Sequence, residues 1–190
     1  TFYTNSSLAD YNVGYATGGA LCFNSSKATI SRSIFLRNDT HRSRNNQGDA
    51  VFVGAFSEVT MTNCLIARNG GAAGEGIWLD GGVAKIDNCT IAYNTSFGIR
   101  RMGGLATVMN SILWENDDDI YQNVAGNVSL SYSTVQDGDN YQVSGCTDVD
   151  PLFCDTETFH LSSMHGHYTN GFFSGGMWTN ALVNSGVIDL

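Results

Sequence analysis

One eleven-residue pattern recurs five times along this chain, and it constrains the fold more than any other feature. The five copies align without gaps and end at residues 38, 69, 94, 116 and 138, so that successive ends lie 31, 25, 22 and 22 residues apart. Self-similarity at a period of about 20 to 50 residues is typical of solenoids, whose units stack on one another and bury one continuous core. The copies span residues 28–38, 59–69, 84–94, 106–116 and 128–138.

The aligned columns of the repeat show which positions face the interior of the fold. Positions three and eight are apolar, position six is small, and changeable polar residues lie between them, which is the period-two alternation of a strand with one buried face. Position eleven is Asn in four copies and Gly138 in the fifth, and stacked Asn side chains at a bend can bond to each other and tolerate left-handed backbone. The third column is Ile30, Met61, Ile86, Val108 and Leu130, and the sixth is Ser33, Cys64, Cys89, Ser111 and Ser133.

A second predicted strand precedes each copy. Its inward column is Leu21, Val51, Ile77, Ile99 and Ile120, and its outward column is Cys22, Phe52, Trp78, Arg100 and Tyr121. Each coil would leave its apolar face uncovered until the next coil stacks about 4.8 Å away. The sequence therefore predicts an all-β parallel β-helix of about five coils over residues 1–140, followed by an irregular C-terminal cap over residues 141–190.

Two motifs resemble known families of right-handed parallel β-helices. Gly18-Gly19-Ala20-Leu21 followed by Phe35-Leu36-Arg37-Asn38 resembles the GGA(I/L/V)…FxxN repeat of the polymorphic outer-membrane proteins. Residues 148–153, which read DVDPLF, resemble the C-terminal tail of bacterial surface β-helix proteins. The resemblance implies a right-handed coil and an extracellular or cell-surface location. Residues 2–5 (FYTN) match the end of a preceding coil, so we expect this chain to be part of something longer.

Charge is distributed unevenly along the chain. Residues 102–190 contain 11 acidic residues and no Lys or Arg, which makes this half a poor partner for nucleic acid or anionic lipid. No stretch approaches the roughly 20 apolar residues that a membrane span needs. The sequence therefore predicts neither a nucleic-acid partner nor a membrane span.

The outward column is the predicted ligand-binding site. Phe52, Trp78, Arg100 and Tyr121 would lie about 5 Å apart along a solvent-facing sheet, which suits stacked sugar rings. Arg100 could pair with a uronate carboxylate or stack on Trp78. The alternative is an ordinary outer face covered by loops or by a neighbouring chain.

Acidic side chains cluster after the last repeat. Asp137, Asp139, Asp148 and Asp150 supply the oxygen ligands that Ca²⁺ prefers, although the spacing is not that of an EF-hand. These four residues are the predicted site of a structural Ca²⁺, and the alternative is a solvated acidic loop.

Cysteines and glycosylation sequons add two further predictions. Cys146 and Cys154 are eight residues apart in a loop, which suits a disulfide. Cys64 and Cys89 share the small-residue column and are expected to be buried thiols. Of six sequons, only those at Asn24 and Asn127 lie outside the corner columns, where we expect ladder side chains to point inward, so they are the predicted glycosylation sites.

These observations favour a non-catalytic extracellular β-helix, an adhesin-like, structural or appendage component that binds a glycan or protein on its outer face. Its N-terminal coil end would continue into another coil or associate with a second copy. The alternative is a carbohydrate-active enzyme, most plausibly a Ca²⁺-dependent lyase of acidic glycans in which Arg100 and Arg101 act beside Asp117, Asp118 and Asp119. Against the lyase, the aligned columns show no pair of acids at equivalent positions of adjacent coils.

Overall fold

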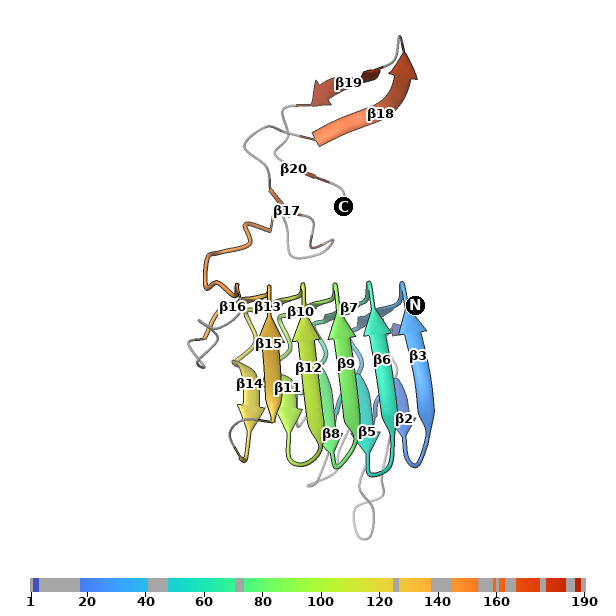
Figure 1. The fold of residues 1–190 in the computed structure, drawn as a ribbon, viewed down its shortest axis with the longest axis vertical. Helices are drawn as coiled ribbons and strands as arrows, with labels where there is room; N and C mark the ends of the chain where they lie inside the picture. Colours follow the sequence, from blue (N-terminus) through green and yellow to red (C-terminus); the bar gives the residue numbers. More distant parts are fainter. Residues whose placement is uncertain are drawn as a thin grey trace. The chain divides into compact units, whose positions relative to one another are not determined.

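The computed structural model describes residues 2–3, 18–40, 48–70, 74–124, 127–137, 145–153, 159, 161–162, 167–174, 177–183 and 187–188. The chain divides into two compact units, residues 1–149 and residues 150–190. The first unit is built from three parallel sheets (Figure 1); each of five coils contributes one strand to each sheet, and β1 adds a sixth strand to one of them. Among the described residues, no helix is long and apolar enough to cross a membrane.

The three sheets follow the repeat. The β4 sheet contains β1 (Phe2–Tyr3), β4 (Ile34–Leu36), β7 (Leu65–Ala67), β10 (Thr90–Ala92), β13 (Ile112–Trp114) and β16 (Thr134–Val135). The β8 sheet contains β2 (Leu21–Phe23), β5 (Val51–Gly54), β8 (Ile77–Asp80), β11 (Phe97–Arg101) and β14 (Asp118–Gln122). The β9 sheet contains β3 (Lys27–Ser31), β6 (Glu58–Thr62), β9 (Val83–Asp87), β12 (Leu105–Met109) and β15 (Val128–Ser131).

The observed register confirms the predicted fold. Val51 pairs with Ile77, and Ile77 with Ile99, in the column predicted to point inward. These three side chains are fully buried, and burying an aliphatic side chain of this size contributes about 1.5–3 kcal/mol. Phe2 pairs with Phe35, which puts β1 one coil before β4, as the FYTN motif predicted.

Each repeat copy turns a corner in its middle. Non-glycine residues adopt positive φ at this corner, with values between 48° and 54°, and the column contains three asparagines, which tolerate that conformation. The corner separates the strands of the β9 sheet from those of the β4 sheet. Its residues are Arg32, Asn63, Asn88, Asn110 and Tyr132.

The second Asn column forms the predicted ladder. The side-chain Nδ2 of Asn38 donates to Oδ1 of Asn69 at 2.9 Å, Asn69 donates likewise to Asn94 at 2.9 Å, and Asn94 to Asn116 at 2.8 Å. The expectation of left-handed backbone at these asparagines was wrong. Positive φ belongs instead to the residue before each one, because the bend precedes the ladder, and these residues are Arg37, Arg68, Tyr93 and Glu115.

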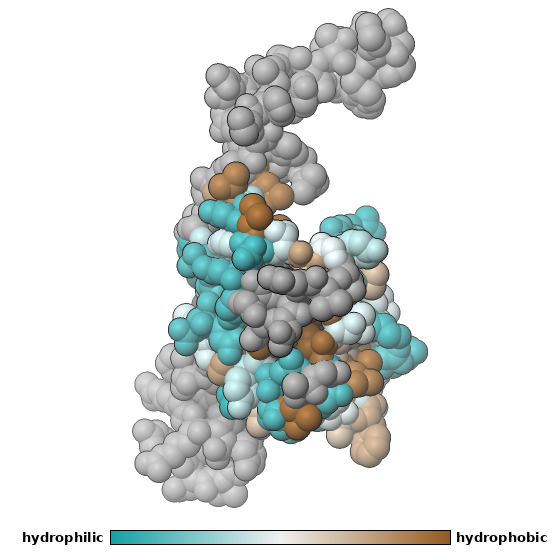
Figure 2. Space-filling view, turned by 60° about the vertical axis from the view of Figure 1, so that its left-hand side comes forward, coloured by the Kyte–Doolittle hydropathy of each residue, from teal (hydrophilic) through white to brown (hydrophobic). Residues whose placement is uncertain are grey.

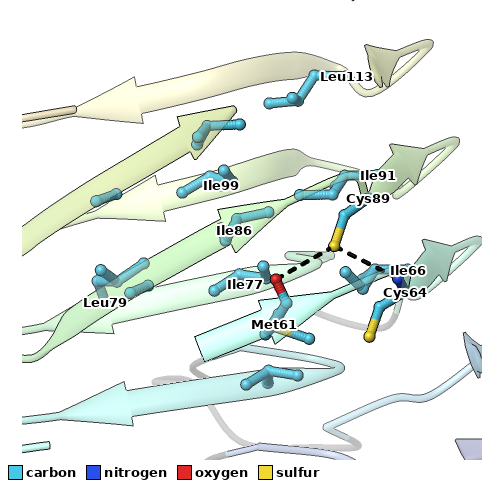
Figure 3. Close-up of a cluster of buried hydrophobic side chains, with 14 of the residues drawn as sticks. Met61, Cys64, Ile66, Ile77, Leu79, Ile86, Cys89, Ile91, Ile99 and Leu113 are labelled. Atoms are coloured by element: carbon cyan, nitrogen blue, oxygen red, sulfur yellow. Dashed lines mark hydrogen bonds between the residues drawn. The ribbon is translucent and has the colours of Figure 1, made fainter. Parts of the chain in front are cut away.

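The small-residue column packs inside the coil, as Figure 3 shows for Cys64 and Cys89. The amide of Cys64 donates to Sγ of Cys89 at 3.4 Å, and the amide of Cys89 donates to Oγ of Ser111 at 3.0 Å. Both thiols are buried, as predicted. Cys89, Ser111 and Ser133 thus each accept a backbone hydrogen bond from the preceding coil, which explains why Ser and Cys can occupy the same column.

The second unit contains two antiparallel pairs. Strand β17 (Leu161–Ser162) pairs with β20 (Val187–Ile188), and β18 (His167–Ser174) pairs with β19 (Met177–Val183). The pairing of β18 with β19 is irregular between Thr169 and Phe172. The repeat is absent from this unit, and its role as a cap stays a prediction.

Candidate functional site

The predicted ligand-binding residues form one row across the β8 sheet. Phe52 pairs with Trp78, Trp78 with Arg100, and Arg100 with Tyr121. The repeat produces this row because residues at the same position of successive parallel coils must stack. The predicted register is therefore confirmed, while ligand binding by these residues stays a prediction.

Exposure divides the row into two halves. Phe52 is 5% exposed and Trp78 is 7% exposed, whereas Tyr121 is 36% exposed and the side chain of Arg100 is 27% exposed. The expectation that all four face solvent was therefore wrong for Phe52 and Trp78. Only the Arg100–Tyr121 end of the row can meet a ligand without rearrangement, and we call it the open end.

Aromatic rings surround the guanidinium group of Arg100. Its Cζ lies 4.2 Å from the centroid of the Trp78 ring, 5.1 Å from that of Phe97 and 5.5 Å from that of Tyr121. The rings of Phe97 and Tyr121 lie 5.1 Å apart at an angle of 43°. A cation held against aromatic faces is stabilised by their quadrupoles, so Arg100 is fixed in place rather than mobile in solvent.

A buried carboxylate completes this cluster. Oε1 of Glu75 accepts a hydrogen bond from Nη1 of Arg100 at 2.9 Å, and Glu75 is fully buried. The pKa of Glu75 is raised to about 7, chiefly by burial and to a smaller extent by the neighbouring Asp49, while Arg100 opposes both effects. Glu75 is thus a carboxyl group that changes its charge near neutral pH.

Asp49 fixes the backbone beside this cluster. Its Oδ1 accepts from the amide of Thr40 at 2.8 Å and also from the Thr40 hydroxyl, and its Oδ2 accepts from the amide of Gly74. Burial raises the pKa of Asp49 above its ordinary value, and these hydrogen bonds oppose that effect. Asp49 therefore ties together two segments that lie in adjacent coils.

Sequence reasoning missed Asp49 and Glu75. Each lies two residues before a member of the inward column, Val51 and Ile77, and these two members are paired. The two acids therefore occupy equivalent positions of adjacent coils, contrary to the argument that no such pair exists. Extending the aligned columns by two residues toward the N-terminus would have revealed them.

Three polar atoms of this cluster are buried without a hydrogen-bond partner. They are Oε2 of Glu75, Nε1 of Trp78 and Nε of Arg100. Buried polar groups are almost always paired with protein, water or ligand, so an unpaired group needs an explanation. All three atoms are buried from solvent, so a ligand at the open end does not contact them directly.

The acidic residues predicted to hold Ca²⁺ do not gather in the part of the chain that the structure describes. Asp137 accepts the amide of Asp119 at 2.8 Å, Asp148 and Asp150 are exposed, and Asp139 lies outside the described residues. No three His, Cys, Asp or Glu side chains in that part are grouped closely enough to hold an ion.

Arg101 and Asp119 of the predicted lyase site have structural roles. Arg101 donates through Nε to the carbonyl oxygen of Gly104 at 2.9 Å. Asp119 is 1% exposed and accepts from Nδ2 of Asn116 at 2.6 Å. Burial raises the pKa of Asp119 to about 6, in agreement with a carboxyl group enclosed by protein.

The predicted disulfide between Cys146 and Cys154 is not found. Cys146 is a free thiol that packs against the core, and Cys154 lies outside the described residues. Thr147 pairs with Thr134, which places Cys146 beside Ser133 and extends the small-residue column by one position. That packing, which the loop spacing did not reveal, holds the Cys146 side chain toward the core.

The sequons differ in accessibility. Asn24 is exposed and Asn127 is half-buried, and their glycosylation stays a prediction. Asn38 and Asn94 are buried in the ladder as expected. Asn88 was expected to point inward but is exposed, because its corner column lies on the outside of the coil.

The face of the molecule seen in Figure 2 mixes apolar and polar residues. On the face shown in Figure 2, hydrophobic residues form separate patches between hydrophilic ones. Tyr121 and Tyr132 are two of the exposed aromatic side chains in the described part of the chain.

Comparison with known proteins identifies the family to which the fold belongs. The family model described as "Right handed beta helix region" matches residues 18–172 of the chain. Neither the curated proteins nor the solved structures include a significant match. Proteins that carry such a domain include surface proteins and polysaccharide-degrading enzymes.

Proposed function

Because the chain belongs to the right-handed β-helix family, we propose that it is a non-catalytic component of a cell surface or extracellular assembly that binds a glycan at the open end of its outward row. The location rests on the resemblance of Gly18-Gly19-Ala20-Leu21 and Phe35-Leu36-Arg37-Asn38 to the polymorphic outer-membrane repeats. The glycan rests on the geometry around Arg100 and Tyr121.

The observation that carries this proposal is the stacked cluster at the open end. Tyr121 is 36% exposed, and its ring lies beside the guanidinium of Arg100, which is itself stacked on Trp78. Tyrosine offers a large apolar face together with a polar hydroxyl, which suits ligands with apolar and polar faces such as sugar rings. On the face shown in Figure 2, apolar residues lie in separate patches between hydrophilic ones, which favours a glycan over a broad hydrophobic protein interface on that face.

Burial argues against the enzyme alternative. A general acid or base must come within hydrogen-bond reach of the substrate, directly or through one water. Glu75 and Asp49 are fully buried, and Asp119 is 1% exposed. Each of the three accepts hydrogen bonds that hold the fold together. The arrangement therefore supports binding better than a Ca²⁺-dependent lyase.

Glycan binding is tested with the whole chain on an array of immobilised polysaccharides, followed by calorimetry with the oligosaccharides that bind. Tyr121→Ala should weaken binding by about tenfold or more, because it removes the exposed ring. Tyr132→Ala is the matched control, since Tyr132 is exposed but lies at the outer corner. Absence of any bound glycan, or an equal loss in the Tyr132 variant, would contradict the proposal.

The enzyme alternative is tested on the same preparation. Incubation with a uronate polymer and Ca²⁺ should yield no unsaturated product by absorbance. Steady product formation that is abolished in Arg100→Ala, while the variant keeps its thermal midpoint, would establish lyase activity instead.

A further inference from the structure

The buried acids beside the open end outnumber the basic side chains bonded to them. Asp49 and Glu75 occupy equivalent positions of adjacent coils, and the amide of Ala50 donates to the carbonyl oxygen of Glu75 at 3.3 Å, so the two coils adjoin here. The charge of Asp49 acts on Glu75 at this separation. Both acids are fully buried, and among the described residues only Arg100 supplies a basic group to the pair. Two buried carboxylates with a single counter-charge favour uptake of a proton by one of them.

The hydrogen bonds indicate that Glu75 is the acid that takes up the proton. The carboxylate of Asp49 accepts from the amide and hydroxyl of Thr40 and from the amide of Gly74. Glu75 accepts from Nη1 of Arg100 alone, and its Oε2 is buried without a partner. Each donor stabilises the ionised form of a carboxyl group, so these contacts favour ionisation of Asp49 over that of Glu75.

Protonation of Glu75 would change the charge of the open end without moving its side chains. Oε1 of the neutral carboxyl group can still accept from Nη1 of Arg100, and the three surrounding rings still hold the guanidinium group. The ion pair is neutral when Glu75 is ionised, and the charge of Arg100 is uncompensated when Glu75 is protonated. Because the Arg100 side chain is 27% exposed, this charge acts on a ligand at the open end without any contact to Glu75.

Other acids set the background charge of the open end. Asp118 pairs in register with Phe97, one of the rings around Arg100, and the exposed Asp117 precedes it. Asp119 is buried on the same strand, and burial raises its pKa to about 6. While Glu75 is ionised, an acidic ligand at the open end therefore meets these aspartates and a compensated arginine.

We propose that Glu75 is a proton-operated switch of the open end, whose protonation leaves Arg100 with an uncompensated charge and so lets the glycan site accept acidic saccharides that its ionised state disfavours. This inference rests on the proposed glycan-binding function and adds the regulation of that site by pH. The proton is exchanged with solvent, and no covalent bond of the ligand is made or broken. Ligand binding and proton uptake are reciprocal, so a saccharide that prefers the protonated state must raise the proton affinity of Glu75.

The test measures binding of matched probes by calorimetry on the full chain. The probes are gluco-, xylo- and galacto-oligosaccharides, each with and without sulfate. The charge of a sulfate ester does not titrate between about pH 5.5 and pH 8, whereas that of Glu75 does. We expect a sulfated probe to bind about fivefold or more tightly at the lower pH than at the higher one, and its unsulfated form to change by less than about twofold.

Proton uptake gives a second readout that needs no variant. Near neutral pH, where Glu75 is partly protonated, binding of the sulfated probe should draw a fraction of a proton from the buffer. Calorimetry in two buffers with different ionisation enthalpies measures this uptake. The unsulfated probe should take up none.

Glu75→Gln is the informative variant, since glutamine keeps the shape of the side chain, can accept from Arg100 and carries no charge. We expect it to bind the sulfated probe equally at both pH values, as tightly as the unmodified chain does at the lower one, and without proton uptake. Asp119→Asn is the matched control, because Asp119 is another buried acid with a raised pKa near the open end, and it should keep the pH dependence. Thermal midpoints of both variants show whether an affinity change reflects folding.

The outcomes separate the inference from the function on which it rests. Tighter binding of a sulfated probe at the lower pH, lost in Glu75→Gln and kept in Asp119→Asn, supports the switch. A pH dependence that survives in Glu75→Gln or disappears in Asp119→Asn would overturn it, because another acid would then be responsible. Binding of unsulfated probes alone, or of sulfated probes equally at both pH values, would retain the glycan-binding function and overturn the switch. Absence of binding by every probe would refute the function itself, and the switch with it.

Discussion

Removing one side chain from the middle of the Asn ladder should destabilise the whole β-helix. The carboxamide of Asn94 makes four hydrogen bonds that Ala cannot make. Its Oδ1 accepts from the amide and the Nδ2 of Asn69 at 3.0 and 2.9 Å, and its Nδ2 donates to Oδ1 of Asn116 at 2.8 Å and to the carbonyl of Ile66 at 3.2 Å. At roughly 1 kcal/mol for each bond, Asn94→Ala should lower the free energy of unfolding by about 4 kcal/mol.

A loss of about 4 kcal/mol is large enough to show whether the Asn ladder stabilises the fold. Single domains are stable by about 5–15 kcal/mol, so such a loss would shift the urea midpoint far outside experimental error. Asn94 is 2% exposed, and water cannot easily replace the lost partners. The assay is equilibrium urea unfolding followed by circular dichroism.

Asn110→Gly is the matched control for this experiment. Asn110 lies in the outer corner column, is exposed, has φ 49°, and donates to Oδ1 of Asp87 at 2.8 Å. Glycine adopts positive φ without strain, and an exposed hydrogen bond contributes little, so the control should lose less than about 1 kcal/mol. If Asn94→Ala costs no more than the control, the ladder does not stabilise the fold and the reasoning fails.

Three further perturbations test other parts of the structure. The pKa of Glu75 is raised from 4.5 to about 7, so between these pH values the folded chain holds a proton on Glu75 that the unfolded chain releases. The free energy of unfolding should therefore fall as the pH rises from about 4.5 to 7. Glu75→Gln should flatten this dependence, as measured by urea titrations at several pH values. Cys89→Ser should change the free energy of unfolding by less than about 1.5 kcal/mol, because Ser111 occupies the same column and accepts the same backbone hydrogen bond. Cys89→Leu should lower the free energy of unfolding by about 1–3 kcal/mol, because the larger side chain overpacks the core. Equal losses in the two variants would contradict this account of the column. Gly104→Ala should lower the free energy of unfolding by at least about 2 kcal/mol in thermal melts, since φ is +82° and a Cβ would lie 1.8 Å from a backbone oxygen of the preceding coil. Gly145→Ala, at φ +79°, should lower it less, because its Cβ would meet only the edge of an aromatic ring.

The repeat made the fold predictable, because the signal comes from whole columns of aligned residues rather than from single residues. Inward-facing residues such as Ile77 and Ile99 are recognised from the sequence because apolar and polar residues alternate around them and because they align in one column. The structure pairs them as expected. The ladder was equally readable, since identical residues at one position must meet when coils stack. The left-handed residues before the ladder could not be predicted from the sequence, because Arg37, Arg68, Tyr93 and Glu115 are not residue types that favour positive φ.

The candidate site was only half predictable. Alternation placed Phe52 and Trp78 on the outer side of the strand, but it does not report what else covers that side, and both are buried. Glu75 escaped notice because its partner Arg100 lies 25 residues later and because the aligned columns stopped short of the position it shares with Asp49. Cys146 illustrates the same limit, since loop spacing pointed to a disulfide while coil register places it next to the core.

The direction of the Asn ladder has an electrical consequence. Every carboxamide donates toward the next coil, so the amide dipoles from Asn38 to Asn116 point the same way along the axis and polarise one another. The positive end of this row meets the carboxylate of Asp119, which accepts from Nδ2 of Asn116. The arrangement reproduces with side chains what an α-helix achieves with backbone, a macrodipole whose positive terminus is neutralised by an anion. A β-helix of this kind therefore has an electrostatic head and tail, and a side chain that extended the row beyond Asn116 would have to displace that anion.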